Sequence, residues 1–402
     1  RVLSSEKVSK TSRICRIQPE KMPFCDAGSG RDVEVKIFYR TYGHGVTKVL
    51  LINGLAGTHD GWGPQIKGLT GTESPNDDEP TPTDRDSGEI GDREGNGRVE
   101  ACAFDNRGLG RSSVPTRKSE YTTKIMANDA IALLDHLSWG KSHIIGHSLG
   151  AMVACKLAAL VPQRVLSLAM LNVTGGGFQC FPKLEKQTIS IAIRFLRAKT
   201  PEQRAAVDLD THYTKEYLEE YVGSDTRRGI LYKQYVRRLS SRGMQSNYGF
   251  DGQINACWTH RMSSSELESI CSARFLVSII HGRHDVIAQM CYARKLAEKL
   301  QPSARMVELH GGHLVSHERT TEVNQALCEL IQAAEARMSP GDWTNLPEEG
   351  SVGRGGADGI MRWLRICLLY ILSLLAMVVK YARRSLRSWK PVGVSSVSTR
   401  AS

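Results

Sequence analysis

The sequence of 402 residues predicts an α/β protein built on a mostly parallel, doubly wound sheet. Apolar runs typical of buried strands alternate with helical patterns along the chain, an order that favours parallel strands joined by crossover helices. A glycine-flanked serine, Gly146-His147-Ser148-Leu149-Gly150, stands between one such strand and helix. A helical insertion at residues 178–270 and a hydrophobic C-terminal helix complete the predicted architecture.

The serine motif is the most informative stretch. Residues 142–145 predict a strand and residues 151–160 predict a helix. A G-x-S-x-G sequence in this context forms a sharp turn that exposes the serine hydroxyl. Gly146 and Gly150 are needed because side chains there would collide where strand and helix pass closely. We predict Ser148 as a nucleophile; a structural turn serine is the alternative.

A nucleophilic serine needs a base, and the base needs an acid that orients it. Residues 275–280 read as a buried parallel strand and end in a loop that carries Asp285. A helix is predicted next, at residues 290–300. Asp285 is therefore the predicted acid, and the alternative is that it only caps this helix.

The predicted base is His313. It follows a short strand at residues 305–309, and the two glycines before it allow a tight bend. Ser148, Asp285 and His313 then appear in the chain order Ser, Asp, His, each after a predicted strand. Four other histidines compete for the role: His281, His284, His310 and His317.

Acyl transfer also requires donors for a developing oxyanion. The first is the backbone N–H of Leu149, directly after the serine. The strand at residues 48–52 leads into the loop at residues 53–57, where the backbone N–H of Leu55 is the predicted second donor. The alternative is a glycine turn without a chemical role.

Five motifs resemble the α/β-hydrolase superfamily, in its AB hydrolase-1 branch: Asn53-Gly54-Leu55, Asp105-Asn106-Arg107-Gly108-Leu109-Gly110-Arg111-Ser112, Gly146-His147-Ser148-Leu149-Gly150, Gly282-Arg283-His284-Asp285 and Gly311-Gly312-His313. The resemblance covers about residues 32–337, and the sequence between the motifs looks like that of land-plant members. It implies that residues 178–270 form a lid and that Asp105 and Arg107 are mostly architectural. One departure is that Asn53-Gly54 stands where the family usually has His-Gly.

The chain divides unevenly. Nine acidic residues lie between Glu73 and Glu94, so we expect a disordered acidic insertion at residues 70–97. The predicted segments are a polar extension (1–31), the first part of the core (32–177), the lid (178–270), the second part of the core (271–337), a linker (338–360), a membrane-anchoring helix (361–381) and a basic tail (382–402).

Four helices are expected in the predicted lid: Gln187–Ala198, Pro201–Val207, Thr214–Val222 and Arg228–Leu239. Its aromatic side chains either line an acyl pocket or hold the lid together. Its arginines either form a solvated face or, at Arg227, Arg237 and Arg238, meet an anionic head group.

The C-terminal segment favours a membrane anchor over a helix packed on the enzyme. Residues 366–379 carry no charge, and residues 363–381 give nineteen positions if Arg365 and Lys380 within them snorkel to the interfaces. Residues 361–402 hold eight Lys and Arg and no acid, against a net charge of +11 for the whole chain. The basic balance therefore belongs to this segment, and no nucleic-acid partner is expected.

The ten cysteines show no paired or C-x-x-C spacing, which predicts reduced thiols and no zinc site. We therefore expect a membrane-associated protein whose catalytic domain faces the cytosol. No phosphate loop or dinucleotide motif is present, so neither a cofactor nor a metal is predicted. The predicted function is a serine hydrolase acting on a small-molecule or lipid ester. An acyltransferase with the same triad and a ligand receptor on this fold are the alternatives.

Overall fold

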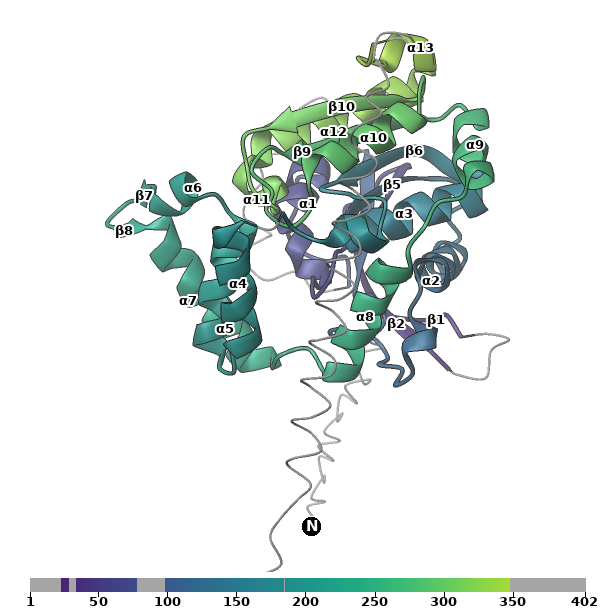
Figure 1. The fold of residues 1–402 in the computed structure, drawn as a ribbon. Coiled ribbons are helices and arrows are strands. Elements are labelled where there is room, and N and C mark those ends of the chain that lie inside the picture. The colour runs from purple at the N-terminus through teal and green to yellow at the C-terminus, as the bar shows by residue number, and fades with distance from the viewer. Residues whose placement is uncertain (1–22, 29–33, 78–97, 184, 348–402) are drawn as a thin grey trace, which may run out of the picture. The chain divides into compact units, whose positions relative to one another are not determined.

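The computed structural model describes residues 23–28, 34–77, 98–183 and 185–347. Within them, eight strands form one sheet in the order β1-β2-β4-β3-β5-β6-β9-β10 (Figure 1). The pairs β1–β2 and β2–β4 are antiparallel, and all other neighbours are parallel. The strands are β1 Phe24–Asp26, β2 Lys36–Tyr42, β3 Thr47–Ile52, β4 Val99–Phe104, β5 Ser142–His147, β6 Val165–Leu171, β9 Leu276–Gly282 and β10 Ala304–Leu309.

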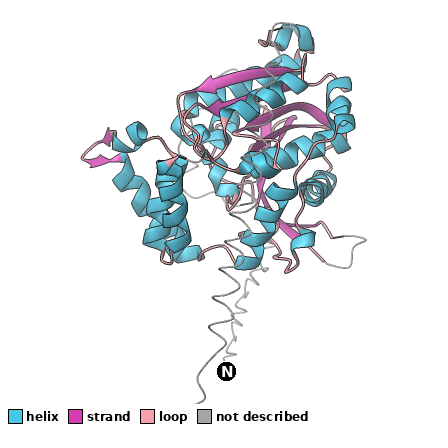
Figure 2. Cartoon of the chain, viewed as in Figure 1, coloured by secondary structure: helices cyan, strands magenta, loops and turns pink. Residues whose placement is uncertain are grey.

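Helices cover both faces of this sheet, as the cartoon in Figure 2 shows. In β3, Leu50 and Ile52 join the apolar core on one face, while Val49 and Leu51 join the core on the other. All four side chains are fully buried, which explains why the strand reads as a continuous apolar run. The first core is shared with α2 (Thr123–His136), α3 (Leu149–Leu160) and α10 (Met290–Lys299), and the second with α1 (Gly63–Thr70) and α12 (Thr320–Glu335).

The carboxyl ends of β3, β5, β6, β9 and β10 meet along one edge, which we call the rim. The register places them together through four opposed pairs: Ile52 and Gly146, His147 and Leu171, Leu171 and Ile280, and Gly282 and Leu309. In open α/β sheets, the loops outside the carboxyl ends of the strands form the binding site. The predicted site residues all follow strands of this rim.

The insertion lies between β6 and β9. Its first part, which we call the α4–α7 unit, comprises α4 (Lys186–Arg197), α5 (Pro201–His212), α6 (Lys215–Glu219), the short hairpin β7 (Tyr221–Val222) and β8 (Asp225–Thr226), and α7 (Arg227–Arg242). These elements pack chiefly on one another. The following helices α8 (Asn247–Thr259) and α9 (Ser264–Ser272) pack on α3 instead. Figure 1 shows the two parts on separate sides of the fold.

Several predicted boundaries were wrong. The helix expected over residues 214–222 ends at Glu219, because the chain turns at Gly223 with a φ of 65° to form the hairpin. After the His313 loop the chain forms two helices, α11 (Val315–Glu318) and α12, which are separated at Arg319 by non-helical angles of −125° and 52°. Helix α5 is five residues longer than predicted, and α8 and α9 were not predicted.

Order also extends further than the composition suggested. Strand β1 lies in the expected polar extension, and Trp343 of α13 (Pro340–Trp343), in the expected linker, is buried and donates its indole N–H to the Val277 carbonyl at 2.8 Å. In the acidic segment, Asp77 pairs with Arg40 at 2.8 Å.

The rest of that acidic segment and the predicted anchor and basic tail (361–402) lie outside the described residues. Among the helices that are described, none has the length and apolar character needed to cross a bilayer.

Candidate active site

Ser148 occupies a strained turn between β5 and α3. Its φ of 54° and ψ of −118° are unusual for a residue with a side chain, and its N–H donates to the Leu171 carbonyl at 2.8 Å. A Cβ at Gly146 would lie 2.4 Å from the Gly150 carbonyl oxygen, and one at Gly150 would lie 2.0 Å from that of Ile52. Both glycines are therefore required by close backbone contacts, as the sequence predicted.

The structure brings the three predicted side chains into one hydrogen-bonded chain. His313 Nε2 lies 3.1 Å from Ser148 Oγ, and His313 Nδ1 lies 2.8 Å from Asp285 Oδ2. When Nδ1 donates its proton to the carboxylate, Nε2 is left free to accept the serine proton. This is the arrangement that activates a serine hydroxyl as a nucleophile.

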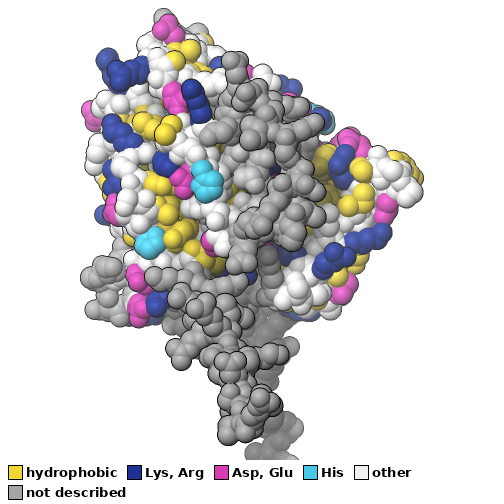
Figure 3. Space-filling model, turned by 180° about the vertical axis from the view of Figure 1, so that it is seen from behind, with side chains coloured by type: hydrophobic (Ala, Val, Ile, Leu, Met, Phe, Trp, Pro, Cys, Tyr) yellow, Lys and Arg dark blue, Asp and Glu magenta, His cyan; other side chains and the backbone are white. Residues whose placement is uncertain are grey.

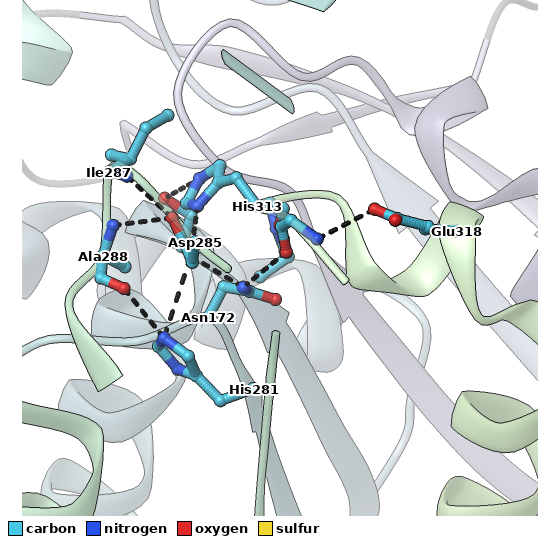
Figure 4. Close-up of polar contacts among 10 residues, drawn as sticks. Asn172, His281, Asp285, Ile287, Ala288, His313 and Glu318 are labelled. Carbon is cyan, nitrogen blue, oxygen red and sulfur yellow. Dashed lines mark hydrogen bonds and ion pairs between the residues drawn. The ribbon is translucent and has the colours of Figure 1, made fainter. Parts of the chain in front are cut away.

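Asp285 is fixed from several sides, as Figure 4 shows. Its Oδ1 accepts the backbone N–H groups of Ile287 and Ala288, each at 2.8 Å, and its Oδ2 accepts the Asn172 amide at 2.7 Å. Burial alone would raise the pKa of this carboxyl group, but the adjacent His313 outweighs burial and lowers the pKa to about 2. Asp285 is thus ionised at neutral pH and held for hydrogen bonding to His313.

The loop that carries His313 is held by its backbone. The His147 ring donates from Nε2 to the His313 carbonyl at 2.8 Å, and burial lowers the pKa of His147 to about 3, so the ring is neutral. Glu318 Oε2 accepts the Gly312 N–H at 2.8 Å (Figure 4). The same carboxylate accepts the N–H and hydroxyl of Thr214, from the connection between α5 and α6. Glu318 therefore joins the His313 loop to the insertion.

The competing histidines make other hydrogen bonds. His281 is buried at the end of β9 and donates to the Ala288 carbonyl at 2.8 Å. His284 and His310 are exposed and contact each other at 3.1 Å. His317 lines the cavity described below, but its Nε2 donates to the Gly61 carbonyl at 2.7 Å.

Asn53, the residue that departs from the family pattern, makes a hydrogen bond across the predicted oxyanion loop. The Asn53 amide donates to the Thr58 carbonyl at 2.6 Å, and the Gly57 N–H donates to the Gly54 carbonyl at 3.2 Å. Within the described part of the chain, the N–H groups of Leu55 and Leu149 donate to no other group. Neither amide is therefore committed to a hydrogen-bond acceptor in this part of the chain.

Asp105 and Arg107 have structural contacts. Asp105 is buried and accepts the backbone N–H groups of His59 at 2.8 Å and Arg111 at 3.0 Å. Arg107 forms a buried, two-pronged ion pair with Asp129, with both N–O distances at 2.5 Å. Neither residue lines the cavity beside Ser148.

Ser148 and His313 open into a cavity of about 320 Å³, at the lower end of the range for small-molecule sites. The oxyanion loop and the insertion form its walls. Most of the lining surface is apolar, and its larger apolar side chains are Leu55, Trp62, Met152, Phe195, Leu239, Ile254 and Leu314. The site can therefore hold a compact, largely apolar molecule against the serine.

Three contributors were missed in the sequence. Asn172 directly follows β6, so its position at a strand end was a usable signal. Glu318 carried no signal, because its partners are the Gly312 N–H and the N–H and hydroxyl of Thr214, which match no motif around Glu318. His212, whose ring stacks on His313 at a centroid distance of 6.4 Å, comes from the insertion, where no motif pointed to it.

Comparison with known proteins defines the class. The family model described as alpha/beta hydrolase fold matches residues 48–320, and the chain belongs to this family. The RutD protein of Caulobacter vibrioides, classed as a carbamate hydrolase, is 30% identical over 288 residues, which cover 71% of this chain and 90% of RutD.

Two further proteins are similar. The dihydrolipoyllysine-residue acetyltransferase component of the acetoin cleaving system of Pseudomonas putida is 24% identical over 57% of this chain, and the match spans only 55% of that relative. The crystal structure of the enol-lactonase from Burkholderia xenovorans LB400 superposes with a TM-score of 0.56 at 20% identity, covering 77% of this chain and all of that one. The likeness to the enol-lactonase supports the fold.

In the view of Figure 3, Lys and Arg side chains are interspersed with Asp and Glu over the coloured surface. In the described part of the chain, no group of three or more His, Cys, Asp or Glu side chains is arranged to hold a metal ion.

Proposed function

We propose that the protein is a serine hydrolase that cleaves a carboxylic ester through an acyl-enzyme. The observation that carries this proposal is the chain from Ser148 through His313 to Asp285, with contacts of 3.1 and 2.8 Å, at the wall of a mostly apolar cavity. Membership of a hydrolase family supports the general class.

In the first half of the proposed reaction, His313 accepts the proton of Ser148 as the serine oxygen attacks the ester carbonyl. Asp285 stabilises the imidazolium that forms. The N–H groups of Leu55 and Leu149 bind the oxyanion, and a single such donor is worth about 10²–10³ in kcat. His313 then protonates the leaving alcohol, and the acyl group remains on Ser148.

In the second half, His313 takes a proton from water, and the resulting nucleophile attacks the acyl-enzyme. Collapse of the second tetrahedral intermediate releases the acid and returns the proton to Ser148. An alcohol acceptor in place of water would give acyl transfer by the same steps, and a carbamate carbonyl, the class of RutD, offers the same point of attack. Product analysis with added alcohols would detect acyl transfer. A comparison of rates on paired ester and carbamate substrates would show which carbonyl the enzyme prefers.

A fluorophosphonate probe tests the proposal directly. We expect covalent labelling of the wild type and none of Ser148→Ala. Ser316→Ala is a matched control, because Ser316 lines the same cavity and should leave labelling intact. An unlabelled wild type, or labelling that survives Ser148→Ala, would refute the proposed nucleophile and leave a ligand receptor on this fold as the better hypothesis.

We also propose that the enzyme works beside a membrane, with its catalytic domain facing the cytosol, as the apolar sequence of residues 361–381 favours. The full chain should remain in the membrane pellet after carbonate extraction, whereas a chain lacking residues 361–402 should be released. Release of both would disprove the anchor without touching the catalytic proposal.

A further inference from the structure

The charges around the cavity do not balance. Besides histidines, three ionised side chains line it, all from the insertion: Arg204 and Asp208 on α5, and Arg238 on α7. Arg204 Nε lies 2.8 Å from Asp208 Oδ1, so these two charges compensate each other. One positive charge is therefore left at the cavity, and it belongs to Arg238.

Arg204 is held as part of the wall. Its guanidinium carbon lies 4.0 Å from the centre of the Phe195 ring, and its ion pair with Asp208 fixes the other side. Both side chains are largely buried, with 22% and 13% of their surface exposed. This pair forms part of the cavity wall, and its two charges cancel.

Arg238 is placed differently. It shares one face of α7 with Tyr235 and Leu239, which also line the cavity, as the spacing of three and four residues requires. One of its N–H groups donates to the Thr58 hydroxyl, beside the oxyanion loop. Among the described residues, no carboxylate pairs with Arg238, although a guanidinium has five N–H donors.

The surroundings make this charge effective. The neighbouring cavity wall is mostly apolar, which strengthens electrostatic attraction relative to bulk water. The adjacent histidines do not add competing charge: burial lowers the pKa of His212 well below its usual value, and burial, assisted by the charge of Arg238, lowers that of His317. Among the described residues, an anion entering the cavity therefore meets one cation that no carboxylate compensates.

We propose that the substrate of the enzyme is an ester that carries a carboxylate, and that Arg238 binds this carboxylate while Ser148 attacks the ester carbonyl. The inference rests on the proposed hydrolase function. One uncompensated positive charge matches a monoanion, and the planar guanidinium fork matches a carboxylate. Arg238 is in this proposal a specificity-determining residue that binds a group remote from the reacting atoms.

The test compares two esters of nearly equal size: mono-p-nitrophenyl glutarate, which is anionic, and its methyl ester, which is neutral. We expect the wild type to prefer the anionic ester by about 10- to 100-fold in kcat/KM, the range for a hydrogen bond to a charged group. Arg238→Gln should remove this preference and change kcat/KM for the neutral ester less than about threefold. Raising the salt concentration should weaken the preference in the wild type.

Arg237→Gln is the matched control. Arg237 precedes Arg238 on α7; both side chains are exposed, but only Arg238 lines the cavity, so the loss of Arg237 changes the net charge equally without touching the site. The preference should survive in this variant. Thermal unfolding of both variants checks that each is folded, and Arg238→Lys should restore part of the preference.

Several outcomes would overturn the proposal. Equal rates for the two esters in the wild type would do so, as would loss of the preference in Arg237→Gln. If the probe labels Ser148 but neither ester is cleaved, monomethyl glutarate should protect the wild type from labelling and fail to protect Arg238→Gln; protection of both, or of neither, refutes the carboxylate site. Absence of labelling refutes the hydrolase function itself.

Discussion

The rim of the sheet and the α4–α7 unit contribute to the same cavity but are built in different ways. At the rim, Ser148, Asp285 and His313 follow parallel strands of the sheet, and each is held by a hydrogen bond that involves a backbone group. The α4–α7 unit has a small apolar cluster of its own, made by Leu209, Tyr213 and Leu218. On α4, the apolar side chains Ile189, Ile193 and Leu196 are 47%, 44% and 75% exposed.

This difference separates two properties of the site. The geometry of proton transfer is set by the sheet, whose buried strands give the rim high local stability. The shape and charge of the cavity are set by a unit with fewer buried contacts, which is the kind of element that opens and closes over a site. Substitutions should therefore act on rate at the rim and on substrate choice in the α4–α7 unit.

The largest effect is expected for Gly150→Ala at the rim. The new Cβ would lie 2.0 Å from the Ile52 carbonyl oxygen and 2.5 Å from that of Asn53, both backbone atoms that cannot move without shifting β3. We expect the free energy of unfolding to fall by about 3 kcal/mol or more and fluorophosphonate labelling to disappear. Urea denaturation and labelling measure the two effects.

Gly140→Ala provides the control, since a Cβ there meets no atom within 4 Å. Its stability should remain within about 1 kcal/mol of the wild type. A Gly150→Ala protein as stable and as reactive as the control would mean that the rim is less rigid than the contact distances indicate.

These contrasts also explain what the sequence could reveal. The rim was predictable because close packing permits few residues: only glycine fits at 150, and an acid and a histidine must follow particular strands. The insertion was less predictable. The sequence pattern predicted helices α4 to α7, but it did not predict α8, α9 or the β7–β8 hairpin. Contacts such as that between Glu318 and Thr214 join residues 104 positions apart, and no local pattern encodes them.

An intermediate effect is expected for Glu318→Ala, which cuts the link between the two regions. Gly312 and Thr214 would each keep a buried N–H group without its acceptor. We expect a loss of about 2–4 kcal/mol in unfolding free energy. Because the His313 loop would be released, kcat should fall more than KM rises in steady-state assays of an ester.

The exposed acid Glu322, four residues further along the chain on α12, gives the comparison. Glu322→Ala should change stability by less than about 0.5 kcal/mol and leave kcat unchanged. If Glu318→Ala lowered stability but left kcat intact, Glu318 would be a fold residue and the coupling of the two regions would not reach His313.

The smallest effect concerns two carboxylates, one in each region, whose pKa values are shifted in opposite directions. The pKa of Asp285 is about 2, below its usual 3.8, whereas burial raises the pKa of Asp208. A group whose pKa is lowered by folding stabilises the folded protein at a pH above its pKa in the unfolded chain. For Asp285 this stabilisation is lost as the pH falls from about 4 to about 2. A group whose pKa is raised by folding stabilises the folded protein at a pH below its pKa in the unfolded chain. This stabilisation is lost as the pH rises through its pKa in the folded protein.

Asparagine variants should therefore respond to pH with opposite signs. The stability advantage of the wild type over Asp285→Asn should be widest above about pH 4 and shrink by about 2 kcal/mol on acidification. The difference between wild type and Asp208→Asn should instead move against the wild type as the pH rises from about 4. Urea denaturation of the three proteins between pH 2.5 and 6 measures both differences. If the two differences changed with pH in the same direction, the proposed electrostatic contrast between the rim and the α4–α7 unit would be wrong.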